Sequence, residues 1–342
     1  MAQIEMTATE TAANPRTPKP ILEVSKLNTW FHTRRGIVKS VRDVSFTVSK
    51  GEVVGIVGES GSGKSVTGLS ILRLIEEPGQ IEEGSSIRFD GVELTDLDEE
   101  AMRHYRGARI AMIFQNPMMT LNPVQKVGDQ MAEAITEHEN VPKAEVRRRC
   151  IEALKSVGIP SPEQRLTAYP HEFSGGMRQR IVIATALVTN PDLIIADEPT
   201  TALDVTIQAQ ILHQARKLID QTGTAMIWVS HDLATLSELA DRIVVMYAGT
   251  VMETGTTEEI IGSPRHPYTR QLLASVPSRN EPGRELFQIP GTMPSLMSLG
   301  EGCAFASRCH RKTAACEKVV APVTRSATHT VWCVNMEEGA SA

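Results

Sequence analysis

Residues 58–65, GESGSGKS, constrain the fold of this chain more than any other stretch. They follow the apolar run 52–57, which predicts a buried strand, and precede residues 66–74, which predict a helix. In the order strand, glycine-rich turn and helix, the pattern G-x-x-x-x-G-K-S forms a cradle for phosphate groups. Glycines let backbone N–H groups approach the anion, and the helix points the positive end of its dipole at it. The alternative is a flexible Gly- and Ser-rich surface loop, and the flanking strand and helix favour the cradle.

The residue types in this stretch predict a nucleoside triphosphate bound with Mg²⁺. Lys64 is expected to reach the β- and γ-phosphate oxygens, and Ser65 to offer its hydroxyl to Mg²⁺. The residues expected to surround the nucleotide are Gly58, Ser60, Gly61, Ser62, Gly63, Lys64, Ser65 and Thr67.

Composition and charge limit the class of protein. The 342 residues carry a net charge of −6, which argues against general nucleic-acid binding because that needs a basic footprint. The apolar runs are far shorter than the ~20 residues of a membrane-spanning helix. Residues 1–19 are polar, lack the apolar core of a signal peptide and are expected to be a disordered tail. Five cysteines without an export signal indicate free thiols or a metal centre rather than disulfides.

The pattern of apolar residues divides the chain into strand-rich and helical parts. Short β-type runs between 20 and 91 predict strands at 21–27, 44–48 and 87–90. From 116 to about 187 the pattern is helical, with helices expected at 127–138 and 143–157 and a third beginning at Ser174. Residues 92–108 are also expected to be helical.

Three apolar strands separated by helices indicate a parallel sheet that is covered on both faces, at 109–114, 193–197 and 225–230. The runs 242–247 and 250–254, divided by Ala248 and Gly249, predict a hairpin. Beyond Ser263 the composition shifts to Pro, Gly, Ser and Cys, and we expect a separate segment there. No internal repeat is visible, so the chain has one nucleotide cassette.

Two carboxylates follow the apolar strand 193–197. Asp197 is placed to bind Mg²⁺ directly or through water. Glu198 is one residue nearer the γ-phosphate, where a carboxylate can polarise the attacking water.

The stretch FSGGMRQR, residues 173–180, predicts a second anion site. Ser174, Gly175 and Gly176 open an apolar-periodic helix and expose its first N–H groups, although a simple serine cap is the alternative. One nucleotide does not need two cradles in one chain. We therefore expect a dimer in which each chain's second cradle closes over its partner's nucleotide.

With these motifs in order, residues 21–260 resemble the ATP-binding subunits of ABC transporters. GESGSGKS resembles their Walker A motif, LIIADE their Walker B motif, and FSGGMRQR their signature motif, which usually reads LSGGQ, so Phe173 and Met177 depart from it. Gln115 falls at the position of the family's Q-loop glutamine, Thr201–Asp204 resembles the D-loop, and His231 resembles the switch histidine. Phe31 falls where the family places an aromatic that stacks on adenine, with Trp30 as the rival.

The resemblance implies a mechanism shared between two chains. Ser65, Gln115 and Asp197 hold Mg²⁺, Glu198 acts as general base and His231 stabilises the transition state, while Asp204 and the partner's signature residues complete the site. Hydrolysis then releases the dimer, and the opening is passed to membrane subunits through the helical part and the Gln115 loop.

The C-terminal part resembles that of oligopeptide and dipeptide importer ATPases, because residues 263–270, SPRHPYTR, match a short segment typical of that branch. A proline-broken linker before a helix is the alternative. No catalytic role is assigned to His266 or Tyr268.

Four cysteines, Cys303, Cys309, Cys316 and Cys333, are spaced C-x5-C-x6-C-x16-C. Structural zinc sites usually use C-x2–4-C pairs, and that spacing is absent. Four thiolates suit a [4Fe–4S] cluster, and some ATPases of the peptide-importer branch carry one here. Zinc and unligated thiols are the alternatives, with His310 and His329 as substitute ligands. Cys150, on a predicted helix, is expected to be a small buried residue.

These observations predict an α/β fold: a P-loop NTPase core with a mixed or parallel sheet, an antiparallel β subdomain, an inserted helical subdomain and a small Cys-containing segment. The expected boundaries are a tail at 1–19, an ABC ATPase domain at 20–262 with its helical subdomain at about 116–187, and the segment 263–342. The resemblance implies ATP and Mg²⁺ as ligands and peptide import as the function.

The implied partners are a second ATPase subunit in a heterodimer, two membrane permeases and an extracytoplasmic substrate-binding protein, at the cytoplasmic face of a prokaryotic inner membrane, without nucleic acid. Nickel, an opine or another small solute is the alternative cargo. A soluble ABC ATPase of repair or translation is the distant alternative. The short stretch between Lys64 and Ser174 has no room for the long coiled coil of repair ATPases, and translation types have two cassettes.

Overall fold

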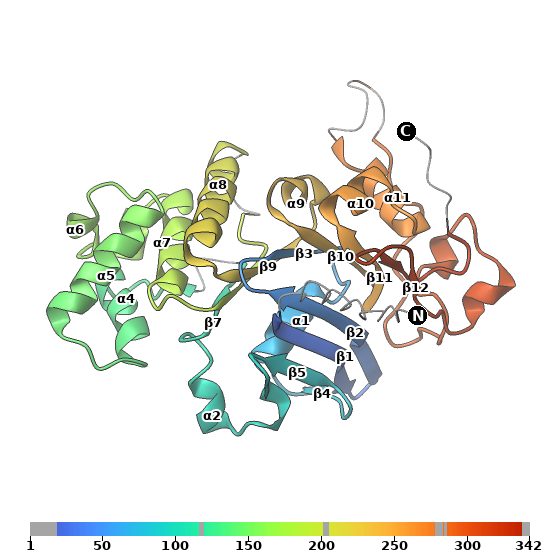
Figure 1. The fold of residues 1–342 in the computed structure, drawn as a ribbon, viewed down its shortest axis with the longest axis horizontal. Coiled ribbons are helices and arrows are strands. Elements are labelled where there is room, and N and C mark those ends of the chain that lie inside the picture. Colours follow the sequence, from blue (N-terminus) through green and yellow to red (C-terminus); the bar gives the residue numbers. More distant parts are fainter. Residues whose placement is uncertain (1–18, 116–119, 201–204, 278–282, 284–285, 337–342) are drawn as a thin grey trace, which may run out of the picture.

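The computed structural model describes residues 19–115, 120–200, 205–277, 283 and 286–336. Residues 1–18 of the tail expected at 1–19 and the stretch Thr201–Asp204 lie outside these residues. Two sheets form the centre of the molecule, and helix α1 (Lys64–Ile71) lies between them, with a lobe of helices at one end (Figure 1).

The smaller sheet is antiparallel and contains the order β2-β1-β5-β6, with β4 paired to β1. Its strands are β1 (Pro20–Thr33), β2 (Gly36–Ser49), β4 (Gly79–Ile81), β5 (Ser86–Phe89) and β6 (Val92–Glu93). The first two strands are longer than the runs predicted from the sequence. Their pairing shifts register between Val24 and Trp30, so the alternation of apolar residues that marks a strand is interrupted there.

The larger sheet has the order β12-β13-β11-β10-β3-β9-β8-β7. Its strands are β3 (Val53–Val57), β7 (Ile110–Ile113), β8 (Leu193–Asp197), β9 (Ala225–Ser230), β10 (Arg242–Tyr247), β11 (Thr250–Thr256), β12 (Val323–Thr324) and β13 (Thr330–Val331). The five strands from β10 to β7 are parallel, and all residues of β3, β8 and β9 are buried. The predicted parallel sheet and the predicted β10–β11 hairpin are confirmed.

Helices cover both faces of the larger sheet. The lobe at one end contains α4 (Val127–Thr136), α5 (Lys143–Ser156), α6 (Pro162–Arg165), η2 (Pro170–Glu172) and α7 (Gly175–Leu187). The helices outside the lobe, besides α1, are α2 (Glu99–Arg103), α8 (Val205–Thr222), α9 (Leu233–Leu239), α10 (Thr257–Gly262) and α11 (Pro267–Ala274). Helices α8, α9 and α10 lie on the face opposite the antiparallel sheet (Figure 1). The predicted helices that became α4, α5 and α7 are confirmed.

The helix predicted over 92–108 is wrong for most of that stretch. It contains β6, the short 3₁₀ turn η1 (Leu94–Asp96) and only the short helix α2. The Asp98 carboxylate accepts a hydrogen bond from Ala101 N at 2.8 Å and starts α2 there, and Gly107 turns the chain with a φ of 76°. Local side-chain capping and turn chemistry therefore divide a stretch whose polarity alone indicated a helix.

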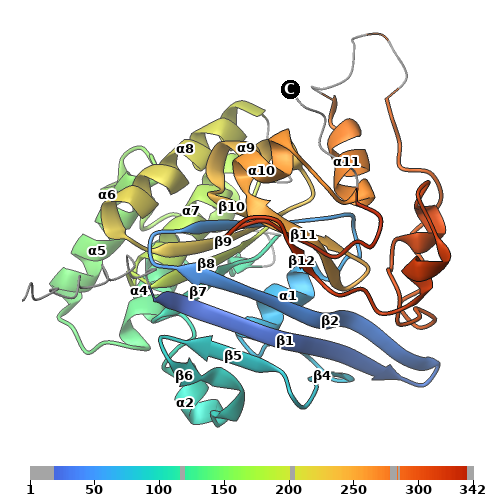
Figure 2. The same cartoon turned by 45° about the vertical axis from the view of Figure 1, so that its right-hand side comes forward.

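The C-terminal residues return to the larger sheet. Strand β13 pairs with β11 and β12 pairs with β13, which extends the sheet at its antiparallel edge (Figure 2). After α11 the segment contains the short 3₁₀ turns η4 (Ala306–Arg308) and η5 (Ala314–Glu317). Within the described part of the chain, no helix has both the length and the apolar character needed to cross a membrane.

Candidate active site

The phosphate loop follows β3 directly and requires glycine at two positions. A Cβ at Gly58 would lie 2.1 Å from the Met246 carbonyl oxygen, and one at Gly63 would lie 2.4 Å from the Ser40 carbonyl oxygen. Gly63 also has a φ of 96°, which a residue with a side chain rarely adopts. The main chain can therefore pass close to its neighbours and turn its N–H groups inward at the start of α1.

Lys64 is buried at the centre of the loop, and its ammonium group is held by the loop itself. Its Nζ donates to the carbonyl oxygens of Gly58 at 2.8 Å and Glu59 at 3.0 Å. Burial lowers the pKa of Lys64, although the nearby Glu198, Asp197 and Glu59 carboxylates oppose that effect. A bound phosphate would replace these carbonyl oxygens as the partner of the ammonium group.

Ser65 and Asp197 meet at one point beside the loop. The Ser65 hydroxyl donates to Asp197 Oδ1 at 2.9 Å, and Asp197, the last residue of β8, is only 7% exposed. Burial raises the pKa of Asp197, and Glu198 adds to this, while the Ser65 hydrogen bond and Lys64 oppose it. Hydroxyl and carboxylate oxygens are ligands that Mg²⁺ prefers, so this donor pair fits the predicted ion.

Glu198 lies between the other two predicted catalytic residues. Its Oε2 is 3.2 Å from Gln115 Nε2 and 3.2 Å from His231 Nδ1. The three residues come just after the carboxyl ends of β7, β8 and β9, which pair in parallel and so end at one edge of the sheet. The tertiary structure thus joins three residues that are far apart in the sequence.

The backbone of Glu198 is also unusual. Its φ is 45°, a conformation that costs free energy for a residue with a side chain, and its N–H donates to the Val229 carbonyl oxygen at 3.0 Å. The Glu198 side chain is 15% exposed, whereas that of His231 is 56% exposed. This geometry turns the carboxylate away from the strand direction and towards the site.

The other loop residues differ in accessibility. Ser60 and Gly61 are exposed, whereas Ser62 is fully buried and its hydroxyl has no partner among the described residues. Thr67 lies in an unexpected place: it is fully buried, and its hydroxyl donates to the Gly63 carbonyl oxygen at 2.9 Å. A nucleotide contact through this hydroxyl would require that bond to break.

The predicted second cradle begins helix α7. Ser174 caps the helix, since its hydroxyl accepts a hydrogen bond from Met177 N at 3.3 Å. Ser174 and Gly175 are exposed, and no atom lies within 4 Å of a Cβ placed on Gly175. The helix N-terminus is therefore open to an approaching group. Asp204, predicted to cross the dimer interface, lies outside the described residues.

The two aromatic candidates for adenine stacking point to opposite faces of β1, as adjacent strand residues do. A Cβ placed on Gly79 would lie 2.6 Å from the Phe31 ring, so this ring packs tightly against β4. The Trp30 ring lies beneath Lys39, whose Nζ is 4.3 Å from the ring centre, and it lines a groove together with Trp332. The adenine contact of Phe31 stays a prediction.

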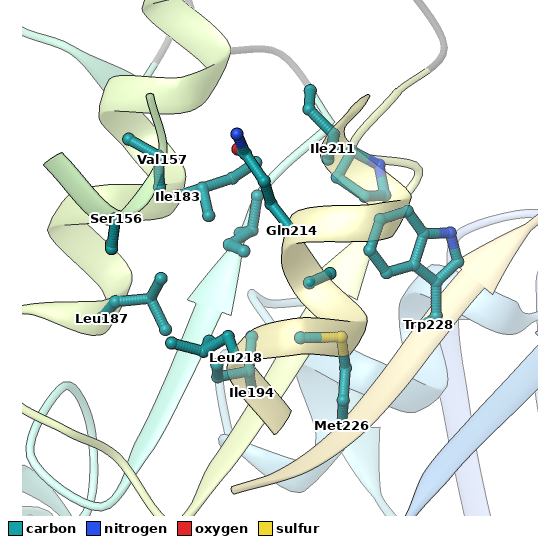
Figure 3. A pocket seen from close by; sticks show the side chains of 13 residues that line it. Ser156, Val157, Ile183, Leu187, Ile194, Ile211, Gln214, Leu218, Met226 and Trp228 are labelled. Carbon is teal, nitrogen blue, oxygen red and sulfur yellow. The ribbon is translucent and has the colours of Figure 1, made fainter. Parts of the chain in front are cut away.

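A small apolar cavity lies between the helical lobe and the core (Figure 3). Val157 and Leu187 line it from the lobe, Leu218 from α8, and Met226 and Trp228 from β9. Its lining includes no residue of the predicted ATP site and no charged side chain. The buried side chains of the lobe and of the core otherwise belong to one continuous apolar cluster.

The four C-terminal cysteines converge although their spacing in the sequence is wide. All four line one small enclosed cavity, next to His266 and Asn335. Burial raises the pKa of Cys303 to about 11 and also raises that of Cys333. Among the described residues, no group of three or more His, Cys, Asp or Glu side chains is arranged to hold a metal ion, so the predicted iron–sulfur centre is not supported by a ligand set.

The helical position of Cys150 agrees with its prediction. It is buried on α5, and burial raises the pKa of its thiol to about 11. Tyr268 and Arg308, for which the sequence indicated no role, both contact the phosphate loop at Glu59. The His-Pro-Tyr motif was the only signal that pointed to either of them.

Comparison with known proteins matches two parts of the chain. Residues 41–201 match the family described as "ABC transporter", and residues 252–316 match "Oligopeptide/dipeptide transporter, C-terminal region". The oligopeptide transport ATP-binding protein OppD of Bacillus subtilis is 52% identical over 84% of this chain and 81% of its own length. The dipeptide transport ATP-binding protein DppD of the same organism is 49% identical over 92% of this chain and 94% of its own.

Solved structures agree with these matches. The dimeric ATP-binding cassette MJ0796, in a post-hydrolysis state with ADP and Pi, has a TM-score of 0.62 and 27% identity over 69% of this chain and 98% of its own. The cbiO1 protein of Clostridium perfringens has a TM-score of 0.61 and 26% identity over 70% of this chain and 90% of its own. The predicted fold class is confirmed.

Proposed function

This chain belongs to the family of ABC transporter ATP-binding proteins, in its oligopeptide and dipeptide branch, and we propose that it hydrolyses ATP to drive peptide import across a membrane. The observation that carries the hydrolytic part is the position of Glu198, between Gln115 and His231 and next to Asp197. The match of residues 252–316 and the relatives named above support peptides as the cargo.

The site residues divide the work of hydrolysis. Lys64 exchanges its carbonyl partners for β- and γ-phosphate oxygens. Ser65, Asp197 and Gln115 would hold Mg²⁺, which neutralises charge on the phosphate oxygens. Glu198 accepts a proton from the attacking water as its oxygen bonds to the γ-phosphorus and the bond to the β-phosphate oxygen breaks. His231 donates a hydrogen bond to the γ-phosphate as charge shifts in the transition state.

The lid of the site is supplied by a second chain. The exposed N-terminus of α7, at Ser174 and Gly176, is suited to cap a γ-phosphate across a dimer interface. We expect the partner to be a different ATPase, in a complex with two permeases and an external substrate-binding protein. The chain then lies at the cytoplasmic face of the inner membrane without crossing it.

Transport measurements test the cargo. A strain that lacks this chain should lose uptake of labelled dipeptides and keep uptake of nickel, and expression of the chain should restore it. Loss of nickel uptake alone would assign the other cargo. Purification from membranes with the chain as bait should recover permeases and a second ATPase, whereas ribosomes or DNA in their place would contradict the transport function.

We further propose that Cys303, Cys309, Cys316 and Cys333 hold a [4Fe–4S] cluster. The support is that all four cysteines line one cavity, since such clusters take one thiolate for each iron, although the thiols are not arranged as a ligand set and would have to move to bind iron. When bound, the cluster would cross-link a segment that has little regular structure. Protein purified anaerobically should absorb near ~400 nm and contain about four iron atoms per chain. Cys316→Ser should remove the iron and Cys150→Ser should keep it, whereas stoichiometric zinc would contradict the cluster.

A further inference from the structure

The C-terminal residues contact the phosphate loop at Glu59. The Tyr268 hydroxyl, in the first turn of α11, accepts a hydrogen bond from Glu59 N at 3.0 Å. Arg308 Nη1 lies 2.8 Å and 3.1 Å from the two oxygens of the Glu59 carboxylate. The Arg308 side chain is only 6% exposed and that of Glu59 is 27% exposed, so salt screens this ion pair less than it would a fully exposed one.

The guanidinium of Arg308 is fixed in place by several further partners. It donates to the carbonyl oxygens of Ile289 at 3.0 Å and Pro290 at 2.8 Å, and to the Tyr247 hydroxyl at 3.1 Å. The rings of Tyr247, Tyr268 and Phe305 pack around this point with centroids 4.7 to 5.2 Å apart. Both groups that hold Glu59 therefore belong to one rigid aromatic cluster.

The same cluster joins the cysteine cavity. His266 Nδ1 accepts a hydrogen bond from Tyr268 N at 3.0 Å, so the hydrogen of the neutral ring is on Nε2, which lies 4.0 Å from Cys303 Sγ. Arg308 comes directly before Cys309 in the chain. The His-Pro-Tyr motif thus places one side chain at the cysteines and another, two residues later, at the phosphate loop.

Three groups of Glu59, its N–H, its carboxylate and its carbonyl oxygen, are contacted by other side chains. Its N–H is bound by Tyr268, its carboxylate by Arg308 and its carbonyl oxygen by Lys64. When Lys64 turns to a phosphate, the Glu59 carbonyl oxygen keeps its hydrogen bond from Ser62 N at 3.1 Å, and the two C-terminal contacts remain. These two contacts fix the point where the chain leaves β3 and begins to turn around the anion.

We propose that Tyr268 and Arg308 are positioning residues for ATP, which hold the phosphate loop at Glu59 in its binding conformation. Neither residue needs to touch the nucleotide. A loop that is already ordered loses less conformational freedom on binding, so these contacts strengthen ATP binding. They do not act on the chemical step, because Glu198, Gln115 and His231 belong to other strand ends.

The test is a comparison of KM and kcat for ATP hydrolysis by the full chain assembled with its partner ATPase, together with the Kd of the chain for ATP. Arg308→Met should raise both KM and Kd about tenfold, because a tenfold change corresponds to the loss of about one charge-assisted hydrogen bond. Tyr268→Phe removes one hydroxyl and should raise them about threefold. The kcat at saturating ATP should stay within about twofold. Arg308→Lys keeps the charge without the planar fork and should give an intermediate KM.

A matched control comes from Arg42, which also bonds to the C-terminal segment but not to the loop. Its Nη2 donates to the Gly300 carbonyl oxygen at 2.8 Å. Arg42→Met should leave KM for ATP within about twofold, and in a Glu59→Ala background Arg308→Met should add no further increase. An unchanged KM in Arg308→Met, or an equal increase in Arg42→Met, would overturn the proposal. A lower kcat and melting temperature with unchanged KM would show a structural role only.

Discussion

The phosphate-loop edge of the larger sheet and the segment after Ser263 position their side chains by different means. At the sheet edge, Gln115, Glu198 and His231 come just after buried parallel strands, so their separation follows from the strand spacing of about 4.8 Å. In the C-terminal segment α11 is followed by two strands of two residues each and by short 3₁₀ turns. There, side chains hold one another in place.

Glu253 shows how the second region is held. This fully buried carboxylate of β11 accepts hydrogen bonds from Arg265 N at 2.7 Å and His266 N at 2.9 Å, and it lies 2.7 Å from His329 Nε2. One side chain of the regular sheet thus fixes two stretches of the irregular segment. Strand order is therefore sufficient to bring the three predicted catalytic residues to one edge, whereas a segment with little regular structure depends on individual buried polar contacts.

The largest expected effect tests the sheet edge. Glu198→Gln removes the proton acceptor and leaves the shape of the site, so kcat should fall by about 10²–10⁴ while ATP binding is kept and the closed dimer persists. Steady-state hydrolysis, ATP titration and gel filtration measure these quantities. Glu238→Gln, at an exposed position of α9, is the control and should leave kcat unchanged. Undiminished hydrolysis in Glu198→Gln would remove Glu198 from the role of base.

The next prediction tests the irregular segment. Glu253→Gln removes the buried charge and replaces one carboxylate oxygen by an NH2 group, which cannot accept a hydrogen bond from a backbone N–H. The free energy of unfolding should therefore fall by about 3–5 kcal/mol. Denaturant unfolding measures the loss, and hydrogen exchange should locate it in residues 263–336. Glu258→Gln, at an exposed position of α10, should have almost no effect on either quantity. Equal stability of the two variants would show that Glu253 does not hold the segment.

At the sheet edge a smaller effect is expected, and it is a gain in stability rather than a loss. The raised pKa of Asp197 means that its ionised form costs more in the folded state than in the unfolded state. The free energy of unfolding therefore falls as pH rises from the ordinary value of 3.8 through the folded-state pKa, and it stays lower above it. Without Mg²⁺, Asp197→Asn should raise the melting temperature at neutral pH by about 2–4 °C.

This gain should shrink as pH falls towards 3.8, because the carboxyl group is then neutral in both states. Thermal melts over a pH series, with the exposed Asp96→Asn as control, measure the trend. A stability gain independent of pH would point to packing rather than charge. The variant should also lose Mg²⁺-dependent hydrolysis. The two results together would show that Asp197 serves function and lowers stability.

The smallest expected effect concerns adenine. Phe31→Ala should raise the Kd for ATP about threefold through the loss of ring stacking, and Trp30→Ala should change it by less. Fluorescence titration with ATP and with a triphosphate that lacks the base separates stacking from phosphate binding. An increase in Trp30→Ala alone would assign the adenine contact to the other face of β1.

Much of the fold and of the catalytic edge could be predicted because local patterns report them. Continuous apolar runs before Asp197 and Ser230 indicated buried parallel strands, and the tertiary structure has both. Prediction failed where pairing or capping decides the outcome. The register shifts of β1 hid half of a long strand, and Asp98 begins a short helix in a stretch expected to be helical throughout.

By itself, the sequence determined the phosphate loop, the parallel core and the identity of Lys64, Asp197 and Glu198, because glycine turns, strand periodicity and their order along the chain leave few other folds. Only the tertiary structure brought Tyr268 and Arg308 to Glu59 and gathered four widely spaced cysteines around one cavity. Apart from Tyr268, which lies on α11, those side chains come from loops and short turns. Their positions follow from packing against the finished sheet, and no local pattern encodes such packing.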